Sequence, residues 1–242
     1  MFSDLDRSVR GRLRTLSKEN AETVGRHLVM VGRLLDSEPE LAYEHAQAAV
    51  RRAGRVDVVR EAAGLAAYRT ERYAEALREL RTVRRLSGSA EHLALMADAE
   101  RGLGRPERAV ALSKDPDVET LSPEAAVELA IVLSGARLDL GEAEAAVAAL
   151  ATPLVKAASG DLARRVSAAR ATALAADGRQ EAAAAELLLA GPDEPEDDPE
   201  DVLVFDLDED GGVGDEAVAS SGDRAGAEVD EGAAGLSQDE RR

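Results

Sequence analysis

A helix-turn-helix signature returns five times between Leu28 and Leu189, and this repetition limits the possible fold more than any other feature. The turns align at Ser37, Glu71, Gly104, Gly141 and Gly178, at intervals of 34, 33, 37 and 37 residues. A small alanine follows each turn five residues later: Ala42, Ala76, Ala109, Ala146 and Ala183. Helix pairs of this length bury their apolar faces by stacking on their neighbours. The sequence therefore predicts an all-α solenoid of about five helix pairs over residues 19–191.

Apolar periodicity and helix-breaking residues set the expected helix boundaries. Val24, Leu28, Val31 and Leu35 recur at steps of three and four, which is typical of one helix face. Ser122 followed by Pro123 is a typical helix start. We expect helix pairs over residues 19–52, 58–86, 90–114, 122–152 and 161–189.

Charge separates the C-terminal segment from the rest of the chain. Of the formal net charge of −18, residues 192–242 carry −16, because they hold 19 Asp and Glu against 3 Arg. Their apolar area is too small to offset an ordering entropy of about 1–2 kcal/mol per residue, which predicts an acidic disordered tail. One apolar peptide lies within it: Val202, Leu203, Val204, Phe205 and Leu207. This tail either keeps the chain in solution or carries a recognition peptide for its own array or for a partner.

Residues 1–18 contain five cations among few large apolar residues: Arg7, Arg10, Arg12, Arg14 and Lys18. We expect a basic arm or a marginal first helix. Contact of this arm with nucleic acid is the alternative function, and salt would weaken it. Residues 1–191 are nearly neutral, aromatic residues are scarce and the tail is acidic, which makes nucleic acid the less favoured partner.

No pattern in the sequence indicates catalysis, a cofactor or a metal. The chain has no cysteine, and we assign His27, His45 and His92 to different units as ordinary helix residues. Gly102 and Gly104 fit a turn between helices better than a nucleotide loop, because no third glycine or preceding strand accompanies them. We therefore expect a protein that is not an enzyme and has no cofactor.

The sequence also shows no run of about 18 apolar residues and no secretory signal. We expect a cytoplasmic protein that does not enter a membrane.

The second unit matches the tetratricopeptide consensus best. The matching residues are Gly64, Ala66, Tyr73, Ala76, Leu77, Leu80 and Leu86. The later units keep the turn glycine and the small alanine. Over about residues 19–190 the chain resembles tetratricopeptide-repeat proteins, and in particular uncharacterised ones from actinobacteria. The resemblance implies a helix-pair solenoid that binds a protein or peptide partner without catalysing a reaction.

Mapping the best-matched helices onto the inner wall of such a solenoid predicts the partner-binding residues. These are Glu61, Leu65, Tyr68, Arg69, Asp98, Arg101, Glu128 and Leu138. Exposed Tyr and Arg would be the anchors, because these residue types dominate binding hot spots. Leu65 and Tyr68 have a second interpretation, as core residues between units, and the charged residues have one as an ordinary solvated face.

Overall fold

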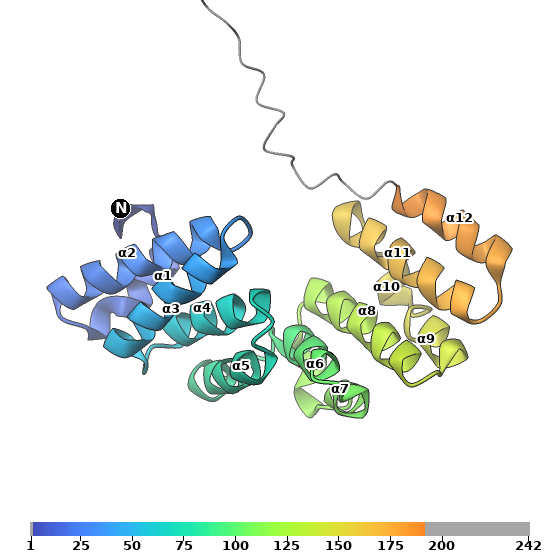
Figure 1. The fold of residues 1–242 in the computed structure, drawn as a ribbon, viewed down its shortest axis with the longest axis horizontal. Helices are drawn as coiled ribbons and strands as arrows, with labels where there is room; N and C mark the ends of the chain where they lie inside the picture. Colours follow the sequence, from blue (N-terminus) through green and yellow to red (C-terminus); the bar gives the residue numbers. More distant parts are fainter. Residues whose placement is uncertain (1, 192–242) are drawn as a thin grey trace, which may run out of the picture. The chain divides into compact units, whose positions relative to one another are not determined.

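The computed structural model describes residues 2–191, which form helices joined by short turns and contain no strand (Figure 1). The α-helices in this range are α1 Arg7–Arg12, α2 Lys18–Leu34, α3 Pro39–Ala53, α4 Asp57–Arg69, α5 Tyr73–Ser87, α6 Leu93–Gly102, α7 Pro106–Leu112, α8 Pro123–Asp139, α9 Ala143–Ala149, α10 Pro153–Lys156, α11 Gly160–Ala176 and α12 Gln180–Ala190. Three 3₁₀ turns accompany them: Phe2–Asp4, Leu13–Thr15 and Pro116–Thr120. The prediction of an all-α fold is confirmed for the described residues.

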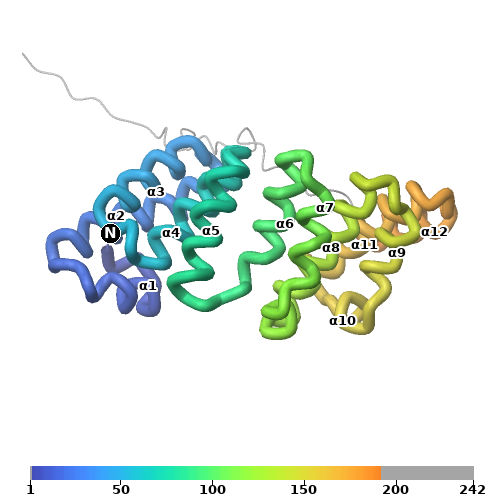
Figure 2. Tube along the Cα trace, turned by 90° about the horizontal axis from the view of Figure 1, so that it is seen from below, coloured from blue at the N-terminus to red at the C-terminus, as the bar shows by residue number. Residues whose placement is uncertain are grey.

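The helices pack in chain order, as the two views of the trace show (Figures 1 and 2). The hairpin partners are α2 with α3, α4 with α5, α6 with α7, α8 with α9 and α11 with α12. The second helix of each pair then contacts the first helix of the next pair, with α10 between α9 and α11. Among residues 2–191, no helix is both long and apolar enough to cross a bilayer.

Four of the five predicted turns contain a residue in the left-handed region. The φ angles are 57°, 67°, 74° and 78° at Glu71, Gly104, Gly141 and Gly178. In the second turn, the Glu71 N–H donates to the carbonyl of Tyr68 at 3.0 Å, and the Arg72 N–H donates to that of Ala67 at 2.8 Å. The other three turns repeat this pair of hydrogen bonds, which defines the Schellman motif. Each motif ends the first helix of its pair.

The first turn has a different geometry. There the Glu38 N–H donates to the carbonyl of Leu34 at 2.8 Å, so the chain adds one more α-type bond before α3 begins. Pro39 is the first residue of α3, where its missing N–H leaves no intrahelical bond unmade. The alignment of Ser37 with the other turns therefore holds in sequence position but not in backbone conformation.

Small residues let the helices of a pair approach closely. All five predicted alanines are buried, with exposed fractions between 0% and 7%. A Cβ atom built on Gly64 would lie 2.7 Å from Cδ2 of Leu80, so a larger residue there would force the Leu80 side chain to move. Gly64 therefore admits the Leu80 side chain between α4 and α5.

The N-terminal residues form helical turns that pack on α2 and α4. Leu13 is completely buried in one core cluster with Val24 and Val59. A Cβ atom built on Gly25 would lie 2.2 Å from the ring of Phe2, so the Phe2 ring lies directly on the backbone of α2. This part of the basic N-terminal segment thus contributes apolar side chains to the core.

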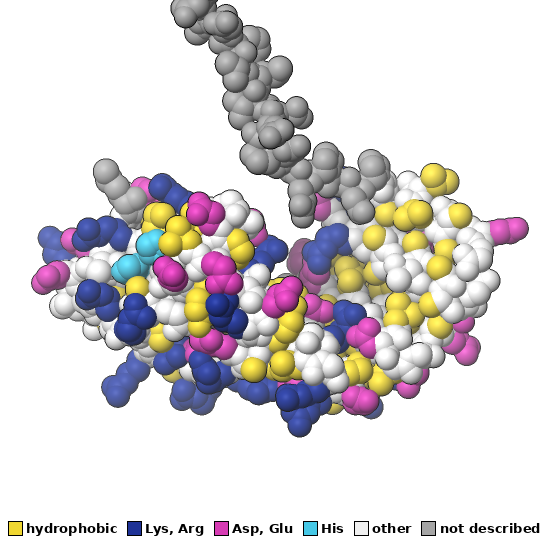
Figure 3. All heavy atoms as spheres, in the orientation of Figure 1, with side chains coloured by type: hydrophobic (Ala, Val, Ile, Leu, Met, Phe, Trp, Pro, Cys, Tyr) yellow, Lys and Arg dark blue, Asp and Glu magenta, His cyan; other side chains and the backbone are white. Residues whose placement is uncertain are grey.

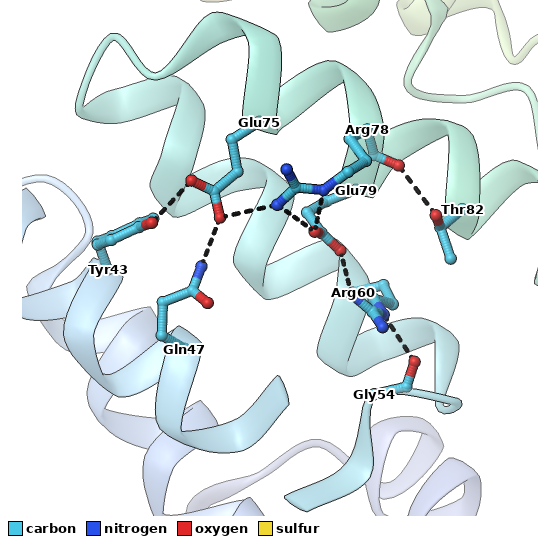
Figure 4. Close-up of polar contacts among 8 residues, drawn as sticks. All are labelled: Tyr43, Gln47, Gly54, Arg60, Glu75, Arg78, Glu79 and Thr82. Atoms are coloured by element: carbon cyan, nitrogen blue, oxygen red, sulfur yellow. Dashed lines mark hydrogen bonds and ion pairs between the residues drawn. The ribbon is translucent and has the colours of Figure 1, made fainter. Parts of the chain in front are cut away.

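Figure 4 shows a buried carboxylate that joins α4 to α5. Glu79 is 3% exposed, and Arg60 NH1 donates to its Oε2 at 2.6 Å. The Arg60 Nε also donates to the carbonyl of Gly54 at 2.6 Å, which fixes the guanidinium between α3 and α5. One turn earlier, Glu75 accepts a hydrogen bond from the Tyr43 hydroxyl at 2.7 Å. These contacts connect the first helix pair to the second.

Candidate interaction surface

The eight residues predicted to bind a partner lie on the first helices of three successive pairs, and we call them the first-helix surface. Glu61, Leu65, Tyr68 and Arg69 belong to α4, Asp98 and Arg101 to α6, and Glu128 and Leu138 to α8. Arg69 is exposed and the other seven are half-buried. Their polar groups connect neighbouring units.

The centre of the first-helix surface is a chain of four polar side chains. The Tyr68 hydroxyl on α4 donates a hydrogen bond to Asp98 on α6. The same carboxylate accepts from Arg101 NH1 at 2.8 Å, and Arg101 Nε donates to Asp139 on α8 at 2.7 Å. The chain therefore runs from α4 through α6 to α8, and Asp139 is a member that sequence reasoning missed.

The protonation states in this chain follow from burial and hydrogen bonding. Burial raises the pKa of Tyr68, and the bond to Asp98 raises it further, so the hydroxyl stays protonated. Burial alone would lower the pKa of Arg101, but the contacts with Asp139 and Asp98 outweigh that effect and raise it. The Tyr68 phenol and the Arg101 guanidinium are therefore held in fixed positions by Asp98 and Asp139.

The remaining charged members of the first-helix surface also pair with the neighbouring unit. Nε2 of His92 lies 3.0 Å from Oε1 of Glu61, and Arg69 lies 2.6 Å from Asp36 in the preceding turn. Arg165 on α11 donates to Glu128 at 2.6 Å, and sequence reasoning did not identify this arginine. The sequence did contain a signal for this pair, because Arg165 and Glu128 are opposite charges 37 positions apart, which is one repeat length.

A cavity of about 530 Å³ lies beside this polar chain. Its lining residues are Tyr73, Asp98, Arg101, Gly102, Gly104, Pro106 and Asp139. A Cβ atom built on Gly102 would lie 2.5 Å from the Tyr73 ring, so the absence of a side chain there admits the ring. Two carboxylates against one guanidinium give the lining a net negative charge, which favours a basic side chain of a partner.

Tyr68 combines the two roles considered for it. Its ring packs against the core cluster that contains Leu80, Leu93 and Met96, and it meets the Tyr73 ring edge to face at 5.9 Å between centroids. Its hydroxyl meanwhile reaches Asp98 in the polar chain. The residue is therefore partly core between units and partly surface.

The assignment of the three histidines to different units was wrong. His27 on α2 and His45 on α3 belong to the same helix pair, and their Nδ1 atoms lie 2.9 Å apart. Histidine side chains are visible together over α2 and α3 in Figure 3. The two positions are 18 residues apart, on helices that face each other across the first turn, and a search for i,i+4 partners within one helix misses such a pair.

Among residues 2–191, no three His, Asp or Glu side chains are grouped so that they could hold a metal ion. The predicted tail peptide, Val202, Leu203, Val204, Phe205 and Leu207, lies outside the described residues. Comparison of the sequence with protein-family models and with curated proteins gives no match, so the tetratricopeptide resemblance depends on the residues of this chain alone.

Proposed function

We propose that this chain is a non-catalytic adaptor, a solenoid of tetratricopeptide-like helix pairs that binds a protein or peptide partner across the first-helix surface. The observation that carries the proposal is the polar chain Tyr68, Asp98, Arg101 and Asp139, which connects three units beside a cavity. Side chains already held in one geometry lose little conformational entropy when a partner binds.

The chemistry of the cavity indicates what the partner presents. Arg101 is already paired with two carboxylates, so the lining offers negative charge and the Tyr73 ring rather than a free cation. A Lys or Arg of the partner would be attracted by Asp98 and Asp139 and would stack on Tyr73. We therefore expect a partner segment with a basic residue flanked by apolar ones.

The test compares two matched substitutions. Leu138→Glu places a charge on the first-helix surface, whereas Leu86→Glu makes the same change on α5, where Leu86 is 39% exposed. The full chain carrying either change is used for affinity purification from the source organism, with circular dichroism to confirm folding. The proposal requires that Leu138→Glu reduces recovery of the wild-type partner while Leu86→Glu retains it. The opposite pattern would assign binding to the second helices.

Retention on heparin over a salt series distinguishes the proposed adaptor from a protein that binds nucleic acid through its N-terminal segment. Arg12 in this segment already pairs with Asp57 at 2.6 Å. An adaptor of the proposed kind elutes at low salt, and a nucleic-acid-binding protein elutes late, with a retention that falls steeply as salt rises.

A further inference from the structure

A second cavity, of about 500 Å³, lies among the N-terminal turns and the start of α2. Its lining residues are Phe2, Arg7, Arg10, Gly11, Leu13, Arg14, Leu16, Lys18 and Ala21. None of them belongs to the first-helix surface. The volume lies within the range of about 300–1,000 Å³ that is common for small-molecule sites.

The cavity combines apolar and cationic side chains. Phe2, Leu13, Leu16 and Ala21 supply the apolar part of the lining. Four cations complete it, and no acidic residue lines it: Arg7, Arg10, Arg14 and Lys18. Within residues 2–191 these four cations form no ion pair, whereas Arg12 between them pairs with Asp57. Positive charge is therefore concentrated around an apolar hollow, and Asp6 is the acidic neighbour that interacts with Arg10.

Arg10, one of the lining residues, carries a hydrogen-bond donor that lacks an acceptor among the described residues. Its Nε–H is buried, and within the described part of the chain it has no hydrogen-bond acceptor. A buried donor without an acceptor is unfavourable, and one attached to a guanidinium more so. Solvent does not reach this N–H in the present conformation, so a small rotation of the Arg10 side chain toward an anionic oxygen in the cavity would supply its acceptor. The same oxygen would offset the charge of the neighbouring cations.

We propose that this cavity binds an organic anion, a phosphate or carboxylate group attached to an apolar chain or ring. The anionic group would contact Arg10 and the surrounding cations, and the apolar part would lie against Phe2, Leu13 and Leu16. Inorganic phosphate alone would leave that apolar surface in water, so it binds more weakly than its alkyl ester. The ligand source is either a free metabolite or a lipid headgroup with its acyl chain.

Gly11 gives a sharp test, because a Cβ atom built there meets no atom within 4 Å although the residue lines the cavity. Gly11→Leu fills space and leaves every charge in place. Gly32 on α2 also has no atom within 4 Å of a built Cβ, but it lies outside the cavity, so Gly32→Leu is the matched control. Arg10→Met removes the unpartnered cation, and Arg55→Met removes an exposed cation elsewhere as its control.

Calorimetric titration of the full chain with octyl phosphate measures the binding. Gly11→Leu and Arg10→Met should each weaken it about tenfold or more, while both controls stay within about twofold of wild type. Inorganic phosphate supplies only the anionic group, and octanol supplies only the apolar chain. Each should bind at least about tenfold more weakly than octyl phosphate. Equal affinity of wild type and Gly11→Leu, or tighter binding of inorganic phosphate than of octyl phosphate, overturns the proposal.

Sedimentation with vesicles separates the two sources of the ligand. Retention on phosphatidylglycerol vesicles that is lost in Gly11→Leu supports a lipid headgroup, and octyl phosphate binding without vesicle retention supports a soluble anion. Retention that is equal in wild type and Gly11→Leu would show general surface attraction and would contradict a built site. Thermal unfolding of each variant confirms that lost binding is not lost folding.

Discussion

Glu71 occupies in the second turn the backbone position that Gly104 occupies in the third, with φ of 57° against 67°. A side chain is disfavoured in this left-handed region, where glycine is unstrained. Glu71→Gly should therefore stabilise the fold, by about 0.5–1 kcal/mol in the free energy of unfolding, once the greater freedom of the unfolded glycine is subtracted. Urea denaturation measures the difference.

The reverse change at the equivalent turn is its control. Gly104→Glu should destabilise the fold by about 1 kcal/mol or more, because the turn must accept a Cβ in the same conformation. Glu71→Gly leaving the midpoint unchanged or lowering it would show that Glu71 makes a favourable contact that outweighs its strain.

Loss of the buried ion pair between Arg60 and Glu79 should lower the free energy of unfolding. Arg60→Leu leaves a carboxylate that is 4% exposed with only the exposed Arg78 as its ion-pair partner, and we expect a loss of about 1–3 kcal/mol. The double variant Arg60→Leu/Glu79→Leu should recover at least half of that loss, because it also removes the buried carboxylate that lost its Arg60 partner. Chemical denaturation of the two variants measures both values.

Arg69→Leu is the matched control for this pair. Its ion pair with Asp36 has side chains that are 53% and 78% exposed, so its removal should change stability by less than about 1 kcal/mol. Equal losses for Arg60→Leu and Arg69→Leu would mean that burial does not determine the effect.

Gly64 should not tolerate a methyl group. Gly64→Ala brings Cβ within 2.7 Å of Leu80, and the resulting overpacking should destabilise the fold by about 1–3 kcal/mol. Gly64→Ala/Leu80→Val should recover part of the loss. Gly32→Ala meets no neighbour and should instead stabilise α2 by about 0.5–1 kcal/mol. A stabilising Gly64→Ala in thermal or urea unfolding would contradict the close approach of α4 and α5.

Acid should weaken the first helix pair through His27. The pKa of His27 is lowered, first because burial disfavours the charged ring and then because His45 and Arg52 add positive charge. The unfolded chain therefore binds more protons than the folded chain below about pH 6.5, and stability falls as pH drops through that value. His27→Gln should reduce the loss of stability between about pH 7.5 and 5.5.

His92→Gln is the comparison variant, because His92 belongs to a different unit and pairs with Glu61. The His92→Gln variant should lose as much stability between about pH 7.5 and 5.5 as the wild-type chain does. The lowered pKa values of Asp6 and Asp115 affect stability only at more acidic pH, where these carboxylates are protonated, so they do not interfere in this window. An unchanged pH dependence in His27→Gln would rule out His27 as its source.

The repeat could be predicted from the sequence because its signals are local. A left-handed residue ends the first helix of four of the five pairs, and glycine supplies it at Gly104, Gly141 and Gly178. A small residue must lie where two helices cross, which identifies the buried alanines. Glu71 lacks the glycine signal and was placed only because its position fits the repeat spacing.

The contacts between units were harder to predict, because they depend on how each helix is rotated. Tyr68 with Asp98 and Arg101 with Asp139 are 30 and 38 residues apart, close to one repeat length. A search for opposite charges at that spacing would have found Asp139. The N-terminal cavity carried no such signal, because it combines two 3₁₀ turns, a short helix and the start of α2.

Photo-crosslinking tests the adaptor account most directly. A photoreactive side chain replaces Leu138 on the first-helix surface or Leu86 on α5, in the otherwise unchanged full chain expressed in its own organism. The account predicts a saturable crosslink to a protein partner from position 138 and none from position 86. A partner crosslinked only from position 86, or equally from both, would contradict the first-helix surface as the binding surface.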